Sequence, residues 1–189
     1  MKYLHENFDL SKKISKKSRK TDKIISVLKE FRDMSKCNIL DIGSGTGIIA
    51  SNLTKYFKKV YGVDTEDYRI VKKGYIFKKV KDEKLPFKDN FFDIIISNQV
   101  IEHVDSPEKH LSEINRVLKK NGICYLATPN KFWVIEPHYK LPFLGMLPKR
   151  LANFYLKLFK NKEYDANLLS YNELSKKSKK HFNIINFNH

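Results

Sequence analysis

Five short segments rich in apolar residues recur along the chain, separated by stretches with apolar residues at every third or fourth position. The short segments lie at 38–42, 59–63, 75–80, 92–97 and 123–128. Short apolar runs are typical of strands buried on both faces. Apolar residues spaced three or four apart indicate helices with one buried face. The pattern therefore predicts strands and amphipathic helices in alternation.

The second pattern predicts amphipathic helices in five places. They lie near 22–31, 48–57, 107–120, 151–160 and 172–180, and a last strand is predicted at 182–187. The first helix is expected to begin near Thr21 or Asp22. The clearest start is Ser106-Pro107-Glu108, with a capping serine, a proline at the first helical position and an acid in the first turn. Asn121-Gly122 is a typical end for that helix.

Composition limits the class of protein. A chain of 189 residues is long enough for one domain with a sizeable core. The two cysteines, Cys37 and Cys124, lie in or beside predicted strands and are expected to be reduced thiols. The sequence has no run of about 18 apolar residues, and 1–20 lacks the apolar segment of a signal peptide. We therefore expect a cytoplasmic protein.

The net charge of +16 favours an anionic partner, such as nucleic acid, a membrane surface or a phosphorylated substrate. Seven basic residues lie close together near the N-terminus: Lys12, Lys13, Lys16, Lys17, Arg19, Lys20 and Lys23. They would contact phosphates or form a solvated, partly disordered arm. We favour the arm and place it at 1–20.

The sequence N-I-L-D-I-G-S-G-T-G at 38–47 places three glycines at alternate positions after a predicted strand. Glycine suits a backbone with positive φ or one that lies close to a ligand. The helix that follows directs its free N–H groups to the same place. The stretch resembles motif I of the class I S-adenosylmethionine-dependent methyltransferases. A dinucleotide fingerprint, G-x-G-x-x-G, would instead require glycine where Ile48 stands.

This resemblance implies that S-adenosylmethionine is the cofactor. Gly43, Gly45 and Gly47 would line its methionine part, and Asp41 would orient its ammonium group through the loop. Asp64 ends the second predicted strand, where a carboxylate can accept two hydrogen bonds from a ribose diol. The alternative role for this aspartate is a helix N-cap. In such enzymes an N-terminal helix commonly closes over the cofactor and substrate, so a lid is a further alternative for the basic arm.

The stretch that carries L-P-F at 85–87 resembles the segment between the third and fourth strands of the same superfamily. There an aspartate four residues before the leucine binds the adenine amino group, but this chain has Lys81 at that place. We assign the adenine contact to the neighbouring Asp82. The alternatives are a backbone amide as the contact and an ordinary exposed acid at this position. Asn98 and Gln99 follow the fourth strand and would flank the methyl group.

The sequence S-N-Q-V-I-E-H-V at 97–104 is the second block that resembles this superfamily. Ubiquinone-type O-methyltransferases and small-RNA 2′-O-methyltransferases carry E-x-x-E-H here, a divalent-metal site. Glu102 and His103 match it, but Gln99 replaces the first acid, which weakens a site for hard cations. We therefore predict no metal ion, although His138 would supply a further ligand if one bound. We assign Glu102, His103 and His138 as acid–base candidates, with His103 as a general base. The alternative is that Glu102 and His103 only shape the wall of the active site.

The segment 131–169 follows the fifth strand, where members of this superfamily insert elements that recognise substrate. Glu136-Pro137-His138-Tyr139 offers an acid, an imidazole and a phenol there. The helix near 151–160 joins an apolar stripe to basic residues. It would cap the site for an amphipathic or lipid-linked substrate, or rest on an anionic membrane. We favour a third interpretation, in which the stripe packs on the sheet and the lysine side chains extend to solvent.

The motifs together imply a doubly wound, Rossmann-like α/β fold with a mostly parallel sheet. The single domain would divide into a basic arm, a cofactor-binding core at 21–130, a substrate cap at 131–169 and a last helix and strand at 170–189. No sequence remains for the usual seventh strand, so we expect either an abbreviated sheet or a chain shorter than its relatives. The expected activity is methyl transfer to a hydroxyl or amine of a small-molecule or lipid/glycan-linked acceptor, by a cytoplasmic or peripheral membrane protein. RNA methylation and an inactive basic binding module are the alternatives.

Overall fold

The computed structural model describes residues 2–186, apart from the side chains of 2–11 and 13. We expected one domain, and the chain separates into two compact units. Unit 1 runs to Asn98 and also contains Arg116–Leu126. Unit 2 contains Gln99–Asn115 and the chain from Ala127 onward.

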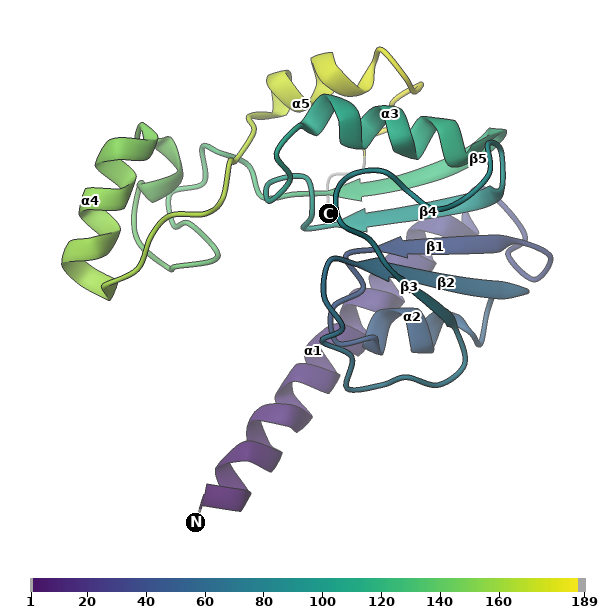
Figure 1. Ribbon diagram of the computed structural model, residues 1–189, viewed down its shortest axis with the longest axis horizontal. Helices are drawn as coiled ribbons and strands as arrows, with labels where there is room; N and C mark the ends of the chain where they lie inside the picture. Colours follow the sequence, from purple (N-terminus) through teal and green to yellow (C-terminus); the bar gives the residue numbers. More distant parts are fainter. Residues whose placement is uncertain (1, 187–189) are drawn as a thin grey trace. The chain divides into compact units, whose positions relative to one another are not determined.

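Unit 1 is built on a sheet with the strand order β3-β2-β1-β4-β5 (Figure 1). The strands are β1 Asn38–Ile42, β2 Lys59–Asp64, β3 Ile76–Lys79, β4 Phe92–Asn98 and β5 Leu118–Ala127. β1 lies parallel to both β2 and β4, and β3 lies parallel to β2. This order and direction confirm the predicted doubly wound α/β fold.

Parallel pairing brings the carboxyl ends of these strands to one edge of the sheet. β1 ends at Ile42, directly before the glycines, while β2 ends at Asp64 and β4 at Asn98. In open α/β sheets, ligands bind outside this edge, at the point where the strand order reverses. The reversal here lies between β1 and β4, which places the glycine loop at the expected cofactor position.

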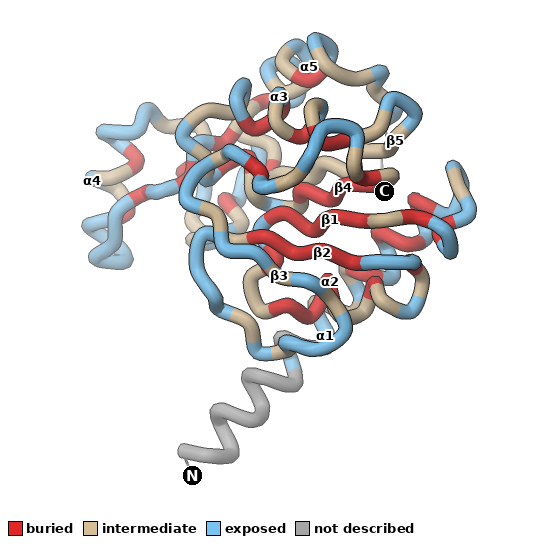
Figure 2. The backbone as a smooth tube through the Cα atoms, turned by 45° about the vertical axis from the view of Figure 1, so that its right-hand side comes forward, coloured by how far each residue is buried: buried red, intermediate tan, exposed pale blue. Residues whose placement is uncertain are grey.

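The core of unit 1 lies between the sheet and two helices, α1 (Lys2–Lys29) and α2 (Ile48–Leu53). Alternate strand residues face these helices, including Ile39 of β1 and Ile94 and Ile96 of β4. The buried residues run along β1, β2 and β4 in Figure 2. Because both faces of these strands are buried, their sequences are almost continuously apolar.

Helix α1 begins much earlier than the predicted start at Thr21 or Asp22. The Thr21 hydroxyl donates a hydrogen bond to the Lys17 carbonyl at 3.0 Å, so this threonine lies inside the helix and does not cap it. Lysine and arginine are good helix formers, so a basic run in which Ile14 is the one aliphatic residue can continue a helix. The partly disordered arm predicted at 1–20 is therefore wrong over 2–20, which are helical.

The boundary between α3 (Pro107–Val117) and β5 also differs from the prediction. The helix does not reach Asn121-Gly122, which belong to β5. The Val117 carbonyl accepts a hydrogen bond from the N–H of Phe91 at 2.8 Å. The last helical carbonyl is thus bound by the segment that enters β4, and the fifth strand starts five residues before the predicted position of 123.

Unit 2 contains most of α3, a short 3₁₀ helix η1 (Leu144–Met146), α4 (Lys149–Lys160) and α5 (Tyr171–Ser178). It has an apolar core of its own, made of Leu144, Ala152, Leu156, Tyr164, Ala166 and Leu168. The predicted cap of α3 is confirmed, since the Ser106 hydroxyl accepts a hydrogen bond from the N–H of Lys109 at 3.3 Å. Ser170 caps α5 in the same way, through a capping box with Glu173.

The apolar stripe of α4 is not packed. Leu151, Phe154 and Leu158 are 55%, 70% and 69% exposed, and the helix buries Ala152 and Leu156 instead. The preferred interpretation of this helix, with its stripe packed on the sheet, is therefore wrong. The buried side of α4 is narrow and packs against η1 and the segment before α5.

The strand predicted at 182–187 is absent over 182–186, and position 187 lies outside the described residues. The N–H groups of His181 and Phe182 both donate to the Ser178 carbonyl, which prolongs the last turn of α5. Both cysteines are free, and burial raises the pKa of Cys124 to about 12. Within the described chain, no helix combines the length and apolar character needed to cross a membrane.

Candidate functional site

The glycine loop follows β1 and has three residues with positive φ. Gly43, Gly45 and Gly47 have φ of 68°, 49° and 76°, values that side chains disfavour. The N–H groups of Gly43 and Ser44 both donate to the Val63 carbonyl, at 2.9 and 3.0 Å. The loop is therefore bound to the carboxyl end of β2 before α2 begins.

A segment that sequence reasoning did not connect with this loop packs closely against Gly47. A Cβ atom at Gly47 would lie 2.2 Å from both the Tyr75 hydroxyl and the Val71 carbonyl oxygen. The N–H groups of Ile70 and Val71 donate to the Thr46 carbonyl, at 2.9 and 3.1 Å. Only glycine fits at this position, and no periodic pattern in 65–75 marks the segment as a neighbour of the loop.

Asp64 is half-buried at the end of β2 and binds the glycine loop directly. Its Oδ2 accepts a hydrogen bond from the N–H of Gly45 at 2.7 Å, and its Oδ1 accepts one from the N–H of Thr65 at 2.8 Å. No helix begins between β2 and β3, so the alternative role as a helix N-cap is wrong. The Thr65 hydroxyl also donates to Oδ1, at 3.5 Å. A carboxylate oxygen has two lone-pair sites, so Oδ2 can still accept from a diol, and Oδ1 can do so if the Thr65 hydroxyl turns away.

Asp41 lies inside β1 and is only 3% exposed, and its Oδ2 has no hydrogen-bond partner. Burial raises the pKa of this carboxyl to about 7, aided by the nearby charge of Asp64 and opposed by that of Lys17. The Ser44 and Thr46 hydroxyls are also buried without partners. Unpaired buried polar atoms are uncommon, so this group beside the glycine loop fits a polar ligand such as S-adenosylmethionine.

The remaining predicted cofactor residues lie in three places. Asp82 is exposed in the loop after β3, where its Oδ1 accepts a hydrogen bond from the N–H of Lys84 at 2.8 Å. It lines an open pocket of about 270 Å³ with Leu85 and Pro86. Asn98 is the half-buried last residue of β4 in unit 1. Gln99 is the first residue of unit 2 and has a positive φ of 59°.

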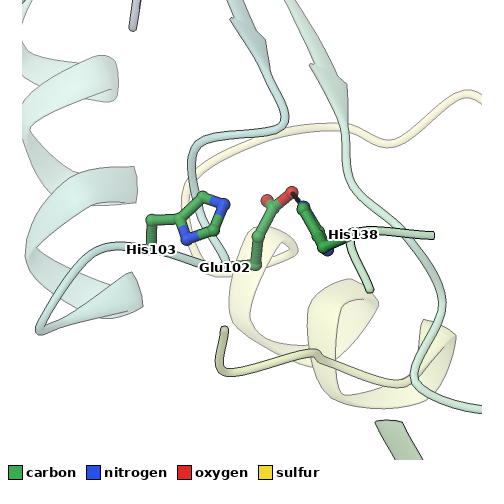
Figure 3. A group of neighbouring side chains, drawn as sticks. All are labelled: Glu102, His103 and His138. Atoms are coloured by element: carbon green, nitrogen blue, oxygen red, sulfur yellow. Dashed lines mark ion pairs between the residues drawn. The ribbon is translucent and has the colours of Figure 1, made fainter. Parts of the chain in front are cut away.

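The three acid–base candidates come together in unit 2, although two separate segments supply them. Glu102 and His103 lie in the turns after β4, while His138 lies in the loop before η1. The side chains point toward one another in Figure 3. Glu102 Oε1 lies 3.7 Å from His138 Nε2, and the two imidazole rings are 5.2 Å apart at 82°. One ligand atom from each residue lies within 4.8 Å of the other two.

Glu102 is fully buried, but only one of its oxygens is hydrogen-bonded. The Thr128 hydroxyl donates to Oε2 at 2.9 Å, and Oε1 has no partner. A buried carboxylate oxygen without a donor is costly unless a cation or a bound ligand lies beside it. One carboxylate and two imidazoles form a common set of ligands for divalent transition metals. The residues present therefore fit a metal ion, although the sequence alone favoured none.

Comparisons with known proteins agree with this fold. Residues 40–126 match the methyltransferase domain family. A ubiquinone biosynthesis O-methyltransferase of Rickettsia typhi is 29% identical over 139 residues, which are 66% of this chain and 55% of that protein. An uncharacterised protein of Methanocaldococcus jannaschii is 36% identical over 122 residues, covering 61% of this chain and 51% of that protein. The chain thus spans about half the length of the curated relatives it matches.

Solved structures give the same result. A methyltransferase of Thermotoga maritima that depends on S-adenosylmethionine is 28% identical, with a TM-score of 0.56 over 78% of this chain and 64% of that one. Another from Aquifex aeolicus is 25% identical, with a TM-score of 0.53 over 70% of this chain and 76% of that one.

Proposed function

Because the chain belongs to the class I S-adenosylmethionine-dependent methyltransferase superfamily, we propose that it methylates a hydroxyl group of an amphipathic, lipid-linked acceptor. The choice of a hydroxyl rests on one observation, the cluster of Glu102, His103 and His138. A hydroxyl must lose its proton as the methyl group arrives, and this cluster offers groups that can take it. The O-methyltransferase names of several relatives agree with this choice.

The cofactor would be held by unit 1. The sulfonium of S-adenosylmethionine supplies an activated methyl group, so the protein mainly has to bring the two reactants together. Asp64 would accept hydrogen bonds from the ribose, while Asp41 and the unpaired Ser44 and Thr46 hydroxyls would meet polar groups of the methionine part. The positive-φ glycines leave room for the cofactor close to the backbone.

Proton removal would fall to unit 2. Imidazole titrates near neutral pH, so a histidine can take a proton from an acceptor hydroxyl at physiological pH. His103 and His138 are both exposed, but His138 is bound through Nδ1 to Glu136 at 2.6 Å. We therefore assign proton transfer to His103. If a divalent cation is held by Glu102, His103 and His138, His103 would be a ligand and not the base, and the cation would lower the pKa of the acceptor hydroxyl instead.

The apolar surface of unit 2 carries the proposal of a lipid-linked acceptor. Two groups of large apolar side chains are exposed there: Phe132, Trp133, Val134, Ile135 and Phe143 in one, and Leu151, Phe154, Leu158 and Phe159 in the other. Large apolar side chains exposed in groups are typical of sites that bind proteins or membranes. The backbones of the first group are held together, because the N–H of Phe143 donates to the Val134 carbonyl at 2.6 Å.

Charge favours an anionic membrane as the partner of this surface. Between 131 and 162 the basic residues are Lys131, Lys140, Lys149, Arg150, Lys157, Lys160 and Lys162, and the one acid, Glu136, is buried. An amphipathic helix with basic flanks and exposed phenylalanine or leucine binds anionic lipid surfaces. A lipid-linked acceptor would then be concentrated where the protein rests.

Calorimetric titration with S-adenosylmethionine, with and without Mn²⁺, tests the cofactor assignment. We expect binding that is lost in Asp64→Ala and kept in Glu66→Gln, a matched change at an exposed acid two residues away. No binding to the folded protein would refute the enzyme and favour a basic binding module. Methylation of RNA but not of a phenolic lipid would refute the proposed acceptor.

A further inference from the structure

The geometry points to Glu136 as a positioning residue for His138. Its carboxylate binds Nδ1 of the imidazole and so directs Nε2 at Glu102. The inference rests on the proposed function, because it assigns a role within the same cluster. Glu136 touches no other member of that cluster except His138, and it takes no part in the chemistry itself.

Glu136 is buried as deeply as Glu102, at 1% exposure, and both of its oxygens are used. Oε1 lies 2.6 Å from His138 Nδ1, and Oε2 accepts a hydrogen bond from the N–H of Tyr139 at 2.7 Å. A carboxylate at this depth is stable only when it is paired and fully hydrogen-bonded. Its ionic partner, in the part of the chain that the structure describes, is His138.

The backbone around Glu136 fixes this carboxylate in turn. Its N–H donates to the Leu141 carbonyl at 3.0 Å, and its own carbonyl accepts from the N–H of Lys140 at 2.7 Å. Gly145 lies against Glu136. A Cβ atom added at Gly145 would be 3.8 Å from Glu136 Cγ and 2.8 Å from a Leu168 methyl group, so no side chain fits between them. The turn therefore holds Glu136 rigidly, and Glu136 holds the imidazole two residues later.

The consequence concerns the two nitrogens of His138. A carboxylate at 2.6 Å from Nδ1 requires a proton on that nitrogen, because two acceptors cannot approach so closely. Nε2 is then the nitrogen that faces Glu102 Oε1, at 3.7 Å. That separation is too long for a good hydrogen bond. Two ligand atoms at about 2.1 Å from one cation lie roughly 3 to 3.5 Å apart, so a small movement would let both bind the same ion.

Carboxylate-to-imidazole-to-metal contacts of this kind orient the ring and raise the basicity of the ligand nitrogen. A purely structural role for Glu136 would be to close the turn at 136–141, which the hydrogen bond to Tyr139 alone could serve. The two roles differ in what they predict for His138. If Glu136 positions His138, Nδ1 must carry a proton, and a change of the Glu136 carboxylate must lower the affinity for a cation. If Glu136 only closes the turn, neither is required.

Nitrogen-15 spectra of the histidine side chains in the unmodified protein give the first test. We expect a proton on His138 Nδ1 both with and without Zn²⁺, and a coordination shift at Nε2 when Zn²⁺ is added. A His138 ring without a proton on Nδ1, or with Zn²⁺ bound at Nδ1, would overturn the inference. This test does not depend on activity or on any variant that might unfold.

Mn²⁺ affinity gives the second test, measured by electron paramagnetic resonance on the unmodified protein, Glu136→Gln and Glu163→Gln. We expect a loss of affinity of about ten- to a hundredfold in Glu136→Gln, and no change in Glu163→Gln, where an exposed acid nearby is altered. Affinity for S-adenosylmethionine should be the same in all three, which shows that unit 1 is intact. Unchanged Mn²⁺ affinity in Glu136→Gln would contradict the positioning role.

The two proposals fail in different ways. If Mn²⁺ and Zn²⁺ do not bind the unmodified protein, the cation part of the proposed function is wrong, and the proton on Nδ1 still decides whether Glu136 orients His138. If the cations bind and Nδ1 carries no proton, the cation site stands and the role of Glu136 is wrong.

Discussion

Gly47→Ala should destabilise the protein far more than Gly45→Ala, although both glycines lie in the same loop at positive φ. At Gly45 a new Cβ would lie 3.9 Å from the Gly43 carbonyl oxygen, an ordinary contact. At Gly47 it would lie 2.2 Å from the Tyr75 hydroxyl and from the Val71 carbonyl oxygen. One variant therefore tests the backbone conformation alone, and the other adds a steric overlap.

The expected magnitudes follow from these contacts. An alanine at positive φ costs about 1 to 2 kcal/mol in either variant. Relieving the overlap at Gly47 requires the segment around Val71 to move, which breaks the hydrogen bonds from the N–H groups of Ile70 and Val71 to the Thr46 carbonyl. Each such bond contributes about 0.5 to 1.5 kcal/mol. We therefore expect Gly47→Ala to lose roughly 2 to 5 kcal/mol in total.

Thermal unfolding followed by circular dichroism measures the difference. For a chain of this size, 1 kcal/mol corresponds to about 2–4 °C in Tm, so Gly45→Ala should lower Tm by about 2–8 °C and Gly47→Ala by at least twice as much. Adding Tyr75→Phe should cost less in Gly47→Ala than in the unmodified protein, because it removes one of the overlapping atoms. Equal losses in the two glycine variants would refute the close packing of 70–75 on the loop.

Three further predictions concern other parts of the molecule. Burial raises the pKa of Asp41 to about 7 from an ordinary value of 3.8, so this carboxyl stabilises the fold most at low pH, and the stabilisation is lost as pH rises from about 4 to 7. Urea titrations should therefore show the free energy of unfolding of Asp41→Asn rising relative to that of the unmodified protein across this range. A difference that does not change with pH would contradict the burial of Asp41. Ser170→Ala removes the capping box with Glu173 and should lower the free energy of unfolding by about 1 kcal/mol, measured in the same titrations, whereas no change would mean that α5 is held by other contacts. The double variant Phe154→Ser, Leu158→Ser should float with vesicles that contain anionic lipid at least tenfold less than the unmodified protein. Its Tm should not change, since both side chains are exposed. Equal vesicle binding by the two proteins would exclude α4 as the membrane contact.

Patterns of neighbouring residues predicted most strands and the glycine turn, but not the ends of two helices. β1 to β4 and the glycine turn were found because their apolar runs and glycines lie together in the chain. The start of α1 was missed because the basic stretch has no apolar face, yet lysine and arginine still form helix. The end of α3 was missed because its last carbonyl is bound by Phe91, a residue distant in sequence.

The candidate site was predictable as a set of residues but not as an arrangement. Motif resemblance identified Glu102 and His103, and it named His138 only as a residue from a later loop. That His138 Nε2 lies 3.7 Å from Glu102 Oε1 depends on the path of the chain after β5, which no periodicity records. The partners of the cluster, Glu136 and Thr128, are single contacts that only the structure reveals. An acid two residues before a histidine in a proline turn was the one available signal for Glu136.

The backbone of Gln99 has a consequence for how this protein would change under selection. Its φ of 59° is one that glycine or asparagine adopts more easily, and its N–H is held by the Ala127 carbonyl at 2.7 Å. This residue joins β4 to the segment that carries Glu102 and His103. Selection for heat resistance alone should therefore favour glycine or asparagine at this position. A glutamine kept in this conformation indicates a constraint on its side chain that backbone stability does not supply.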